Sequence, residues 1–166
     1  FPVGTLVDGG PGGGGPDAGG GSAAPPSRAA FQADLEAAAS CDELFTRSDV
    51  LSLHLVLGPS TAGLVSDARL RQMKSNALLI NTARAGLVDE AALVAALREQ
   101  RIAGAGLDVF GQEPLPSTHP LCALDNVVLS PHLGYATREN LAAFYRGVVD
   151  AIDAWLHGRE PLLLTP

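Results

Sequence analysis

The stretch LLINTARAG, Leu78–Gly86, passes abruptly from apolar to polar residues. The apolar run Ala77–Ile80 lies between Asn76 and the polar residues that begin at Asn81. A short continuous apolar run of this kind is typical of a buried strand in a parallel sheet. Open parallel sheets bind ligands beyond the carboxyl ends of their strands. We therefore expect Arg84 to lie at a ligand site, where its flat guanidinium suits a carboxylate group.

Similar apolar runs alternate with helical patterns along the rest of the chain. Further strands are predicted at Val50–Leu55, Ala103–Val109 and Val127–Leu129, and Thr5–Val7 is a possible short strand. Helices are predicted over Gln32–Ala39, Cys41–Phe45, Ser66–Met73, Asp89–Gln100 and Thr137–His157. Strands that alternate with helices through short connections predict an α/β fold with a doubly wound parallel sheet. We expect residues 31–158 to form this domain.

Length, charge and cysteine content narrow the class of protein. A chain of 166 residues is long enough for one domain with a sizeable core. The net charge of −7 argues against nucleic acid as a partner, and no apolar or basic amphipathic stretch predicts a membrane partner. Cys41 and Cys122 lack the spacing of a metal site, so we predict no metal, reduced thiols and a cytoplasmic location.

Residues 1–30 are unusually rich in glycine and proline, with ten glycines in the first 22 positions. This composition is typical of a flexible, low-complexity segment. Nevertheless, Gly10, Gly12 and Gly15 satisfy the pattern GxGxxG, which can hold a pyrophosphate at the start of a helix. No second strand ending in an acidic residue follows them, so the predicted sheet is incomplete at its amino end. Two interpretations of residues 1–30 therefore stay open: a phosphate loop, and a flexible or altered segment.

Three stretches keep their order and approximate spacing with those of a known family. These are NTARAGLVDEAALVAAL from Asn81, AGAGLDVFGQEPLP from Ala103 and NVVLSPHLGYATREN from Asn126. Together they resemble the D-isomer-specific 2-hydroxyacid dehydrogenases over about Cys41–Gly158. The resemblance implies a Rossmann-like domain that binds NAD, with NADP not excluded, and a small 2-oxo or 2-hydroxy acid as the substrate.

The same resemblance assigns catalytic roles to three residues. Arg84 would anchor the substrate carboxylate, although an ion pair with Asp89 or Glu90 is the alternative. His132 would be the general acid for reduction of the 2-oxo group, a role that suits histidine because its side chain changes charge near neutral pH. Glu113 would bond to one ring nitrogen of His132 and fix its tautomer.

Cofactor contacts also follow from the resemblance. Asp108 would meet the nicotinamide carboxamide, although a helix cap or a strand-end hydrogen bond is the alternative for its carboxylate. Thr82 and Ala83 would line the same pocket, and His54 would lie on the cofactor side unless its role is purely structural. Gly134 would leave room for the ligand beside His132.

Members of this family carry a separate substrate domain ahead of the cofactor domain, and we expect this chain to lack it. One wall of the active site would then be missing, and residues 159–166 would be a tail that returns to that domain. Trp155 and Leu162–Leu164 would expose apolar surface. A homodimer is expected from family habit. A non-catalytic dinucleotide-binding or dimerisation module, and an inactive fragment of the family, stay open as alternatives to a dehydrogenase.

Overall fold

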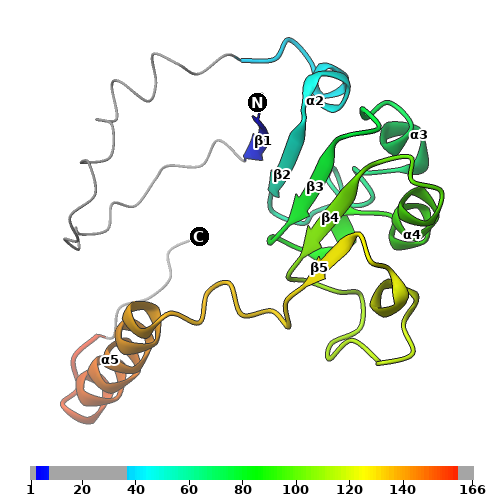
Figure 1. Cartoon of the computed structure of the whole chain (residues 1–166). Coiled ribbons are helices and arrows are strands. Elements are labelled where there is room, and N and C mark those ends of the chain that lie inside the picture. The colour runs from blue at the N-terminus through cyan, green and yellow to red at the C-terminus, as the bar shows by residue number, and fades with distance from the viewer. Residues whose placement is uncertain (1–2, 8–36, 161–166) are drawn as a thin grey trace, which may run out of the picture.

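Five parallel strands form one sheet in the computed structural model, which describes residues 3–7 and 37–160 (Figure 1). Each strand pairs in parallel with the next one along the chain. The strands are β1 (Val3–Val7), β2 (Val50–His54), β3 (Leu78–Asn81), β4 (Gly104–Leu107) and β5 (Val127–Leu129). Because all five are parallel, the loops that follow them leave from one edge of the sheet. The predicted parallel α/β fold is confirmed.

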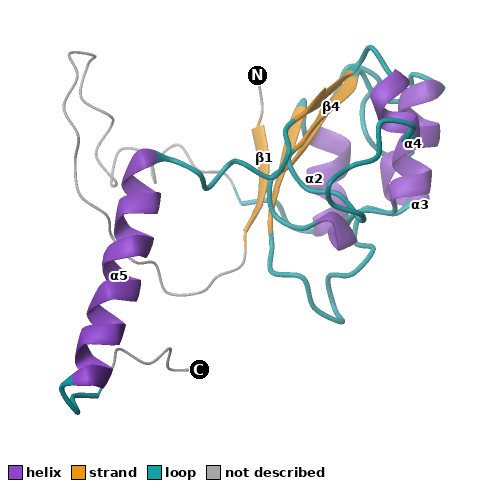
Figure 2. Ribbon diagram, turned by 90° about the horizontal axis from the view of Figure 1, so that it is seen from below, coloured by secondary structure: helices purple, strands orange, loops and turns teal. Residues whose placement is uncertain are grey.

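Three helices cover one face of this sheet, as Figures 1 and 2 show. They are α2 (Cys41–Arg47), α3 (Asp67–Leu70) and α4 (Glu90–Arg98). Two short 3-10 helices, η1 (Ala85–Leu87) and η2 (Pro120–Ala123), lie in the loops. The long helix α5 (Arg138–Leu156) stands apart, beyond the opposite face of the sheet (Figure 2).

Every α-helix that the structure describes begins after a side chain that caps its backbone. The side-chain oxygen of the capping residue accepts a hydrogen bond from the N–H of the third residue beyond it, which would otherwise lack a partner. The capping pairs are Ser40 with Glu43, Ser66 with Arg69, Asp89 with Ala92 and Thr137 with Asn140. Local sequence therefore fixes where these helices start.

The core lies between the sheet and helices α2, α3 and α4. Successive strand residues point to opposite faces, and Leu51, Leu53 and Leu79, which point towards the helices, are fully buried. On the opposite face, Leu78 is 40% exposed and Val128 is 74% exposed. Burial is therefore concentrated on one face of the described part of the sheet.

Strand β4 is built from small residues because its neighbours lie very close. A Cβ atom at Gly104 would stand 2.7 Å from the backbone oxygen of Asn126, which any larger residue would have to displace. At Gly106 it would stand 3.0 Å from a methyl group of Ile80. Within the described residues, the close neighbours of β4 are the adjacent strand β3 and the residue that precedes β5.

Several predicted boundaries differ from the structure. The helix predicted over Gln32–Ala39 lies outside the described residues up to Glu36, and residues 37–39 are not helical. Helix α3 ends at Leu70 rather than Met73, although Met73 is still buried at 6% exposure. The apolar side chains on α5 are exposed, with fractions from 40% to 74%, at Leu141, Phe144, Val148, Ile152 and Trp155. The exposure predicted for Trp155 is confirmed, and Leu162–Leu164 lie outside the described residues.

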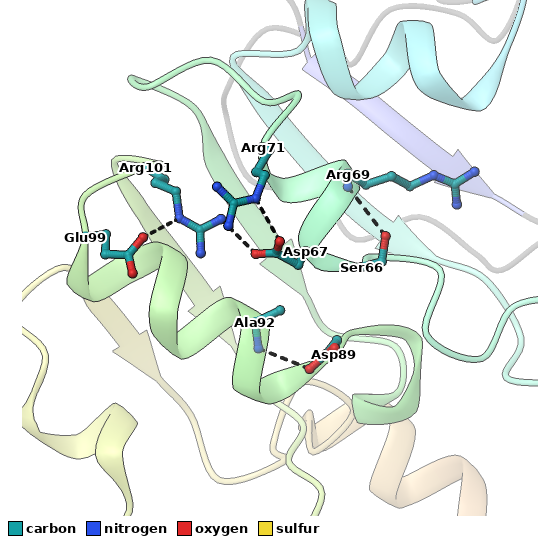
Figure 3. A network of polar contacts seen from close by, with 8 residues as sticks. All are labelled: Ser66, Asp67, Arg69, Arg71, Asp89, Ala92, Glu99 and Arg101. Carbon is teal, nitrogen blue, oxygen red and sulfur yellow. Dashed lines mark hydrogen bonds and ion pairs between the residues drawn. The ribbon is translucent and has the colours of Figure 1, made fainter.

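A polar network joins α3 to the end of α4 on the helical side of the molecule (Figure 3). The carboxylate of Asp67 accepts hydrogen bonds from Arg71 at 2.8 Å and from Arg101 at 3.0 Å. Arg101 also bonds to Glu99 at 2.8 Å. The hydrogen bond from Arg71 is the main cause that lowers the pKa of Asp67, and Arg101 contributes in the same direction. This network ties the residues that follow α4 to the start of α3.

No helix in residues 37–160 combines the length and the apolar character that a membrane span requires.

Truncation of two neighbouring residues on β3 tests the sidedness of the core. Leu79→Ala should lower the free energy of unfolding by about 2–5 kcal/mol, because it leaves a cavity among buried side chains. Leu78→Ala, on the exposed face, should cost about 1 kcal/mol or less. Urea unfolding followed by circular dichroism measures both changes. Equal losses from the two variants would contradict the one-sided core.

Candidate active site

Polar side chains follow β3, β4 and β5 at the edge of the sheet where these strands end. Arg84 comes three residues after β3, Glu113 lies in the loop after β4, and His132 lies in the loop after β5. The three come from neighbouring strands, since β4 pairs with both β3 and β5. Parallel pairing therefore brings the three loops to one edge of the sheet.

His132 and Glu113 are directly hydrogen-bonded. Nδ1 of His132 lies 2.8 Å from Oε2 of Glu113, while Oε1 of the same carboxylate accepts the backbone N–H of Phe110 at 2.9 Å. The bond to His132 comes first among the causes that lower the pKa of Glu113, followed by the bond from Phe110. Glu113 is therefore held as a carboxylate, which favours the His132 tautomer with its hydrogen on Nδ1. The hydrogen bond predicted between these two side chains is present, and their catalytic roles stay predictions.

The backbone around His132 is held by the buried carboxylate of Asp108. Its two oxygens accept the N–H groups of Leu133 and Gly134, both at 2.9 Å. Burial opposes ionisation of Asp108, but a hydrogen bond from Ser130 and these backbone bonds outweigh it and lower its pKa. His132 itself has a φ of 58°, a left-handed conformation that is uncommon for residues other than glycine. Asp108 is therefore a strand-end anchor that stabilises this unusual turn.

Arg84 is exposed and forms no ion pair with any described residue. Its Nη1 donates to the carbonyl of Ala83 at 2.7 Å. The two acidic residues considered as its partners are used elsewhere: Asp89 caps α4, and Glu90 bonds to His119 at 3.1 Å. The guanidinium therefore keeps donors for a ligand.

Two cavities lie beside these groups. One, of about 590 Å³, is lined by His132 and Glu113 together with mainly apolar residues from Phe110 to Pro131. The other, of about 530 Å³, is lined by His54, Leu55, Val56, Leu57, Ala83 and Arg84. Both volumes fall within the range of roughly 300–1,000 Å³ that is usual for small-molecule sites. Arg84 and the His132–Glu113 pair thus line different cavities in this structure.

Comparison with known proteins decides which family carries this arrangement. A family model described as "D-isomer specific 2-hydroxyacid dehydrogenase, NAD binding domain" matches residues 22–134. The chain belongs to this family. A glyoxylate reductase from Thermofilum pendens is 56% identical over 98 residues, which cover 59% of this chain and 29% of that protein. A glyoxylate reductase from Aeropyrum pernix is 45% identical over 122 residues, covering 74% of this chain and 36% of the relative.

A solved structure supports the same assignment. D-lactate dehydrogenase from Lactobacillus jensenii, solved with NAD⁺, superimposes with a TM-score of 0.69 at 31% identity. The superposition covers 77% of this chain and 42% of the dehydrogenase. The Rossmann-like fold predicted from the sequence is therefore confirmed. The chain spans about a third of the length of the two glyoxylate reductases.

The predicted cofactor contacts of this NAD binding domain fall into three groups. His54 and Ala83 line the cavity beside Arg84, and His54 also bonds to Ser52 at 2.8 Å. Asp108 and Gly134 instead bond to each other, so the strand-end alternative describes the contacts of Asp108 in this structure. Thr82 is exposed in the same loop as Arg84. Their roles towards the cofactor stay predictions.

The phosphate loop predicted at Gly10, Gly12 and Gly15 lies outside the described residues. The family match, which begins at residue 22, also leaves these glycines out. The cavity beside Arg84 has the volume of a small-molecule site, and its lining includes His54 and Ala83, two of the residues predicted to contact the cofactor. Among the described residues, no cluster of three His, Cys, Asp or Glu side chains could hold a metal ion.

Sequence reasoning missed three residues that organise the site. Ser130 bonds to Asp108, Tyr135 places its ring edge-on to His132 with centroids 6.0 Å apart, and Asn81 bonds on both sides to the Arg84 loop. Only Asn81 carried a usable signal, because an amide that ends an apolar strand is often buried and then requires partners.

Replacement of Asp108 tests its role as an anchor. An amide in Asp108→Asn cannot accept at both ends, so either the Leu133 or the Gly134 N–H loses its acceptor, at a cost of about 1–3 kcal/mol. Amide exchange of these two residues should accelerate. Asp125→Asn, at an exposed position, is the control and should change stability by no more than about 0.5 kcal/mol. Unchanged exchange at both amides in Asp108→Asn would refute the anchoring role.

Proposed function

We propose that this chain supplies the cofactor-side half of the active site of an NAD-dependent D-2-hydroxyacid dehydrogenase. The reaction is the reversible reduction of a small 2-oxo acid to a 2-hydroxy acid, with NADP as the alternative cofactor. One observation carries this proposal: the hydrogen-bonded pair of His132 and Glu113 lies at the same sheet edge as Arg84, which no described acidic residue neutralises.

Arg84 has the chemistry to bind the substrate carboxylate. Its guanidinium can donate two parallel hydrogen bonds to the two carboxylate oxygens, a geometry that lysine cannot reproduce. In this position its charge also draws electron density from the neighbouring 2-oxo group. This makes the carbonyl carbon more electrophilic and stabilises negative charge that develops on its oxygen.

His132 is the proposed general acid and base. With Nδ1 bonded to Glu113, its Nε2 is the atom that gives a proton to the 2-oxo oxygen during reduction and takes it back during oxidation. The carboxylate of Glu113 stabilises the imidazolium that precedes proton transfer. The nicotinamide, when bound, supplies the hydride for the 2-oxo carbon. Hydride and proton together convert the 2-oxo acid to the 2-hydroxy acid.

The substrate, in this proposal, is enclosed between these residues and a second domain. The glyoxylate reductases that the chain matches are about three times longer than the matched region, which leaves ample length for such a domain. Closure between the two parts would bring the cavity beside Arg84 and the cavity beside His132 around one ligand. It would also exclude water from the reaction.

A non-catalytic dimerisation module is the second candidate, and helix α5 favours it. Large apolar side chains on α5, including Phe144 and Trp155, are exposed in this structure, as a surface that meets a partner would be. A homodimer belongs to this proposal as well as to the dehydrogenase.

The unpaired thiols of Cys41 and Cys122 support a cytoplasmic location.

Replacement of Arg84 by lysine tests the proposed reaction. NADH oxidation should be followed with glyoxylate, hydroxypyruvate and pyruvate as substrates, and oxamate, an unreactive 2-oxo acid analogue, should be titrated by NMR. Arg84→Lys should weaken binding of the acid by at least about tenfold, because a charged hydrogen bond is lost. Arg98→Lys, at an exposed position on α4, is the matched control.

Two results would count against the dehydrogenase proposal. Equal affinity for the acid in wild type and Arg84→Lys would remove Arg84 from the substrate site. Binding of NADH without turnover of any 2-oxo acid, in a protein that joins this chain to a substrate domain, would favour the non-catalytic module.

A further inference from the structure

Asn81 is one of three buried polar residues among those that the structure describes, together with Ser48 and Asp108. It ends β3, and its side chain points to the helical face of the sheet with 2% exposure. A buried amide is costly unless both its ends are hydrogen-bonded. The partners of Asn81 therefore show what this position requires.

Both ends of the Asn81 amide bond to the loop that carries Arg84. Oδ1 accepts the backbone N–H of Ala83 at 3.1 Å, and Nδ2 donates to the backbone carbonyl of Arg84 at 3.0 Å. The backbone oxygen of Asn81 accepts the N–H of Asp108 at 3.0 Å, which ties the same residue to β4. One buried side chain thus fixes two successive residues of the Arg84 loop against the sheet edge.

The two hydrogen bonds of the Asn81 amide set the direction of the Arg84 side chain. Arg84 has an extended backbone, with φ −145° and ψ 137°, and no side-chain cap supports the 3-10 helix η1 that follows it. Its carbonyl accepts from Nδ2 of Asn81 and from the N–H of Leu87 at 3.2 Å. Because the backbone on both sides of its Cα is held, the bond to Cβ leaves the loop in one direction. Only the outer torsions of the arginine stay free to adjust to a ligand.

This pair of hydrogen bonds is specific to asparagine. It needs one acceptor and one donor, at opposite ends of a short planar group. An ionised aspartate offers acceptors only, an alanine offers neither, and a glutamine is longer by one carbon. The cavity at this position is small, about 20 Å³, and is lined by Asn81, Glu90 and otherwise apolar side chains.

We propose that Asn81 is the positioning residue for Arg84, holding its guanidinium where the carboxylate of a 2-oxo acid is bound. This inference rests on the proposed function, because it assigns Arg84 a carboxylate to bind. It adds a residue that touches neither substrate nor cofactor and acts through the backbone of Arg84.

Three variants of the 166-residue chain test the inference. Asn81→Asp keeps the shape of the side chain but loses the donor, and Asn81→Ala loses both bonds. Asn126→Asp is the matched control, because it removes a similar amide donor, to the carbonyl of Leu97 at 3.1 Å, from the opposite end of the sheet. The readouts are the dissociation constant for oxamate by NMR titration and the amide exchange rate of Ala83.

Asn81→Asp should weaken oxamate binding by about tenfold at neutral pH, the effect of a lost hydrogen bond to a charged site. This defect should shrink as the pH falls from about 8 to about 5. Burial, with Glu90 in the same cavity and Asp108 after the next strand, raises the pKa of the new carboxyl, and its protonated form regains a donor for the Arg84 carbonyl.

Each variant is compared with wild type at the same pH, so that ionisations common to both proteins cancel. Asn81→Ala should show a defect of constant size across this range and faster exchange at Ala83. Asn126→Asp should bind oxamate as wild type does.

The possible failures are distinguishable. A wild-type chain that does not bind oxamate in the presence of NADH overturns the assignment of Arg84 to the substrate carboxylate, and this inference with it. Wild-type binding that weakens in Arg84→Lys but not in Asn81→Asp overturns this inference alone. Unchanged exchange at Ala83 in Asn81→Ala, or an equal loss of oxamate binding in Asn126→Asp, would also overturn it.

Discussion

Parallel pairing of β3, β4 and β5 is the constraint on which the candidate site depends. A parallel ladder forces each strand to start at one edge of the sheet and to end at the other. The chain must therefore return along the helical side through η1 and α4 or through η2, and each polar loop leaves from the same edge. Arg84 and His132 are 48 positions apart in sequence, with Glu113 between them. The three residues nevertheless belong to adjacent loops.

Behind the exposed groups lies a layer of buried polar side chains. Asn81 bonds to the backbone of the Arg84 loop, and Asp108 bonds to the backbone of the His132 loop. The two are linked because the N–H of Asp108 donates to the carbonyl of Asn81 at 3.0 Å. Groups proposed to act on the ligand are thus exposed or partly exposed, while the groups that hold them are buried and hydrogen-bonded. This division suits a site that needs fixed geometry and access at the same time.

Much of this organisation could be predicted from local sequence. The strand Val127–Leu129 and the helix starts near Ser66, Asp89 and Thr137 follow from residue type and spacing, because strand and helix-start signals act within a few residues. The pair His132 and Glu113 required the family resemblance, since 19 positions separate them.

Other features could not be predicted because they depend on contacts distant in sequence. Asp108 is 25 and 26 positions from Leu133 and Gly134, the residues that it anchors. No hydrophobic periodicity in the sequence predicts such a contact. The exposed face of α5 illustrates the converse, because an apolar stripe predicts a buried face without naming the surface that covers it.

Titration of the purified chain with NADH, followed by cofactor fluorescence, tests the central claim most directly. The central claim is that this chain is a cofactor domain, and such a domain should bind NADH saturably in the micromolar range. Absence of binding up to millimolar NADH, from a chain shown to be folded, would contradict it.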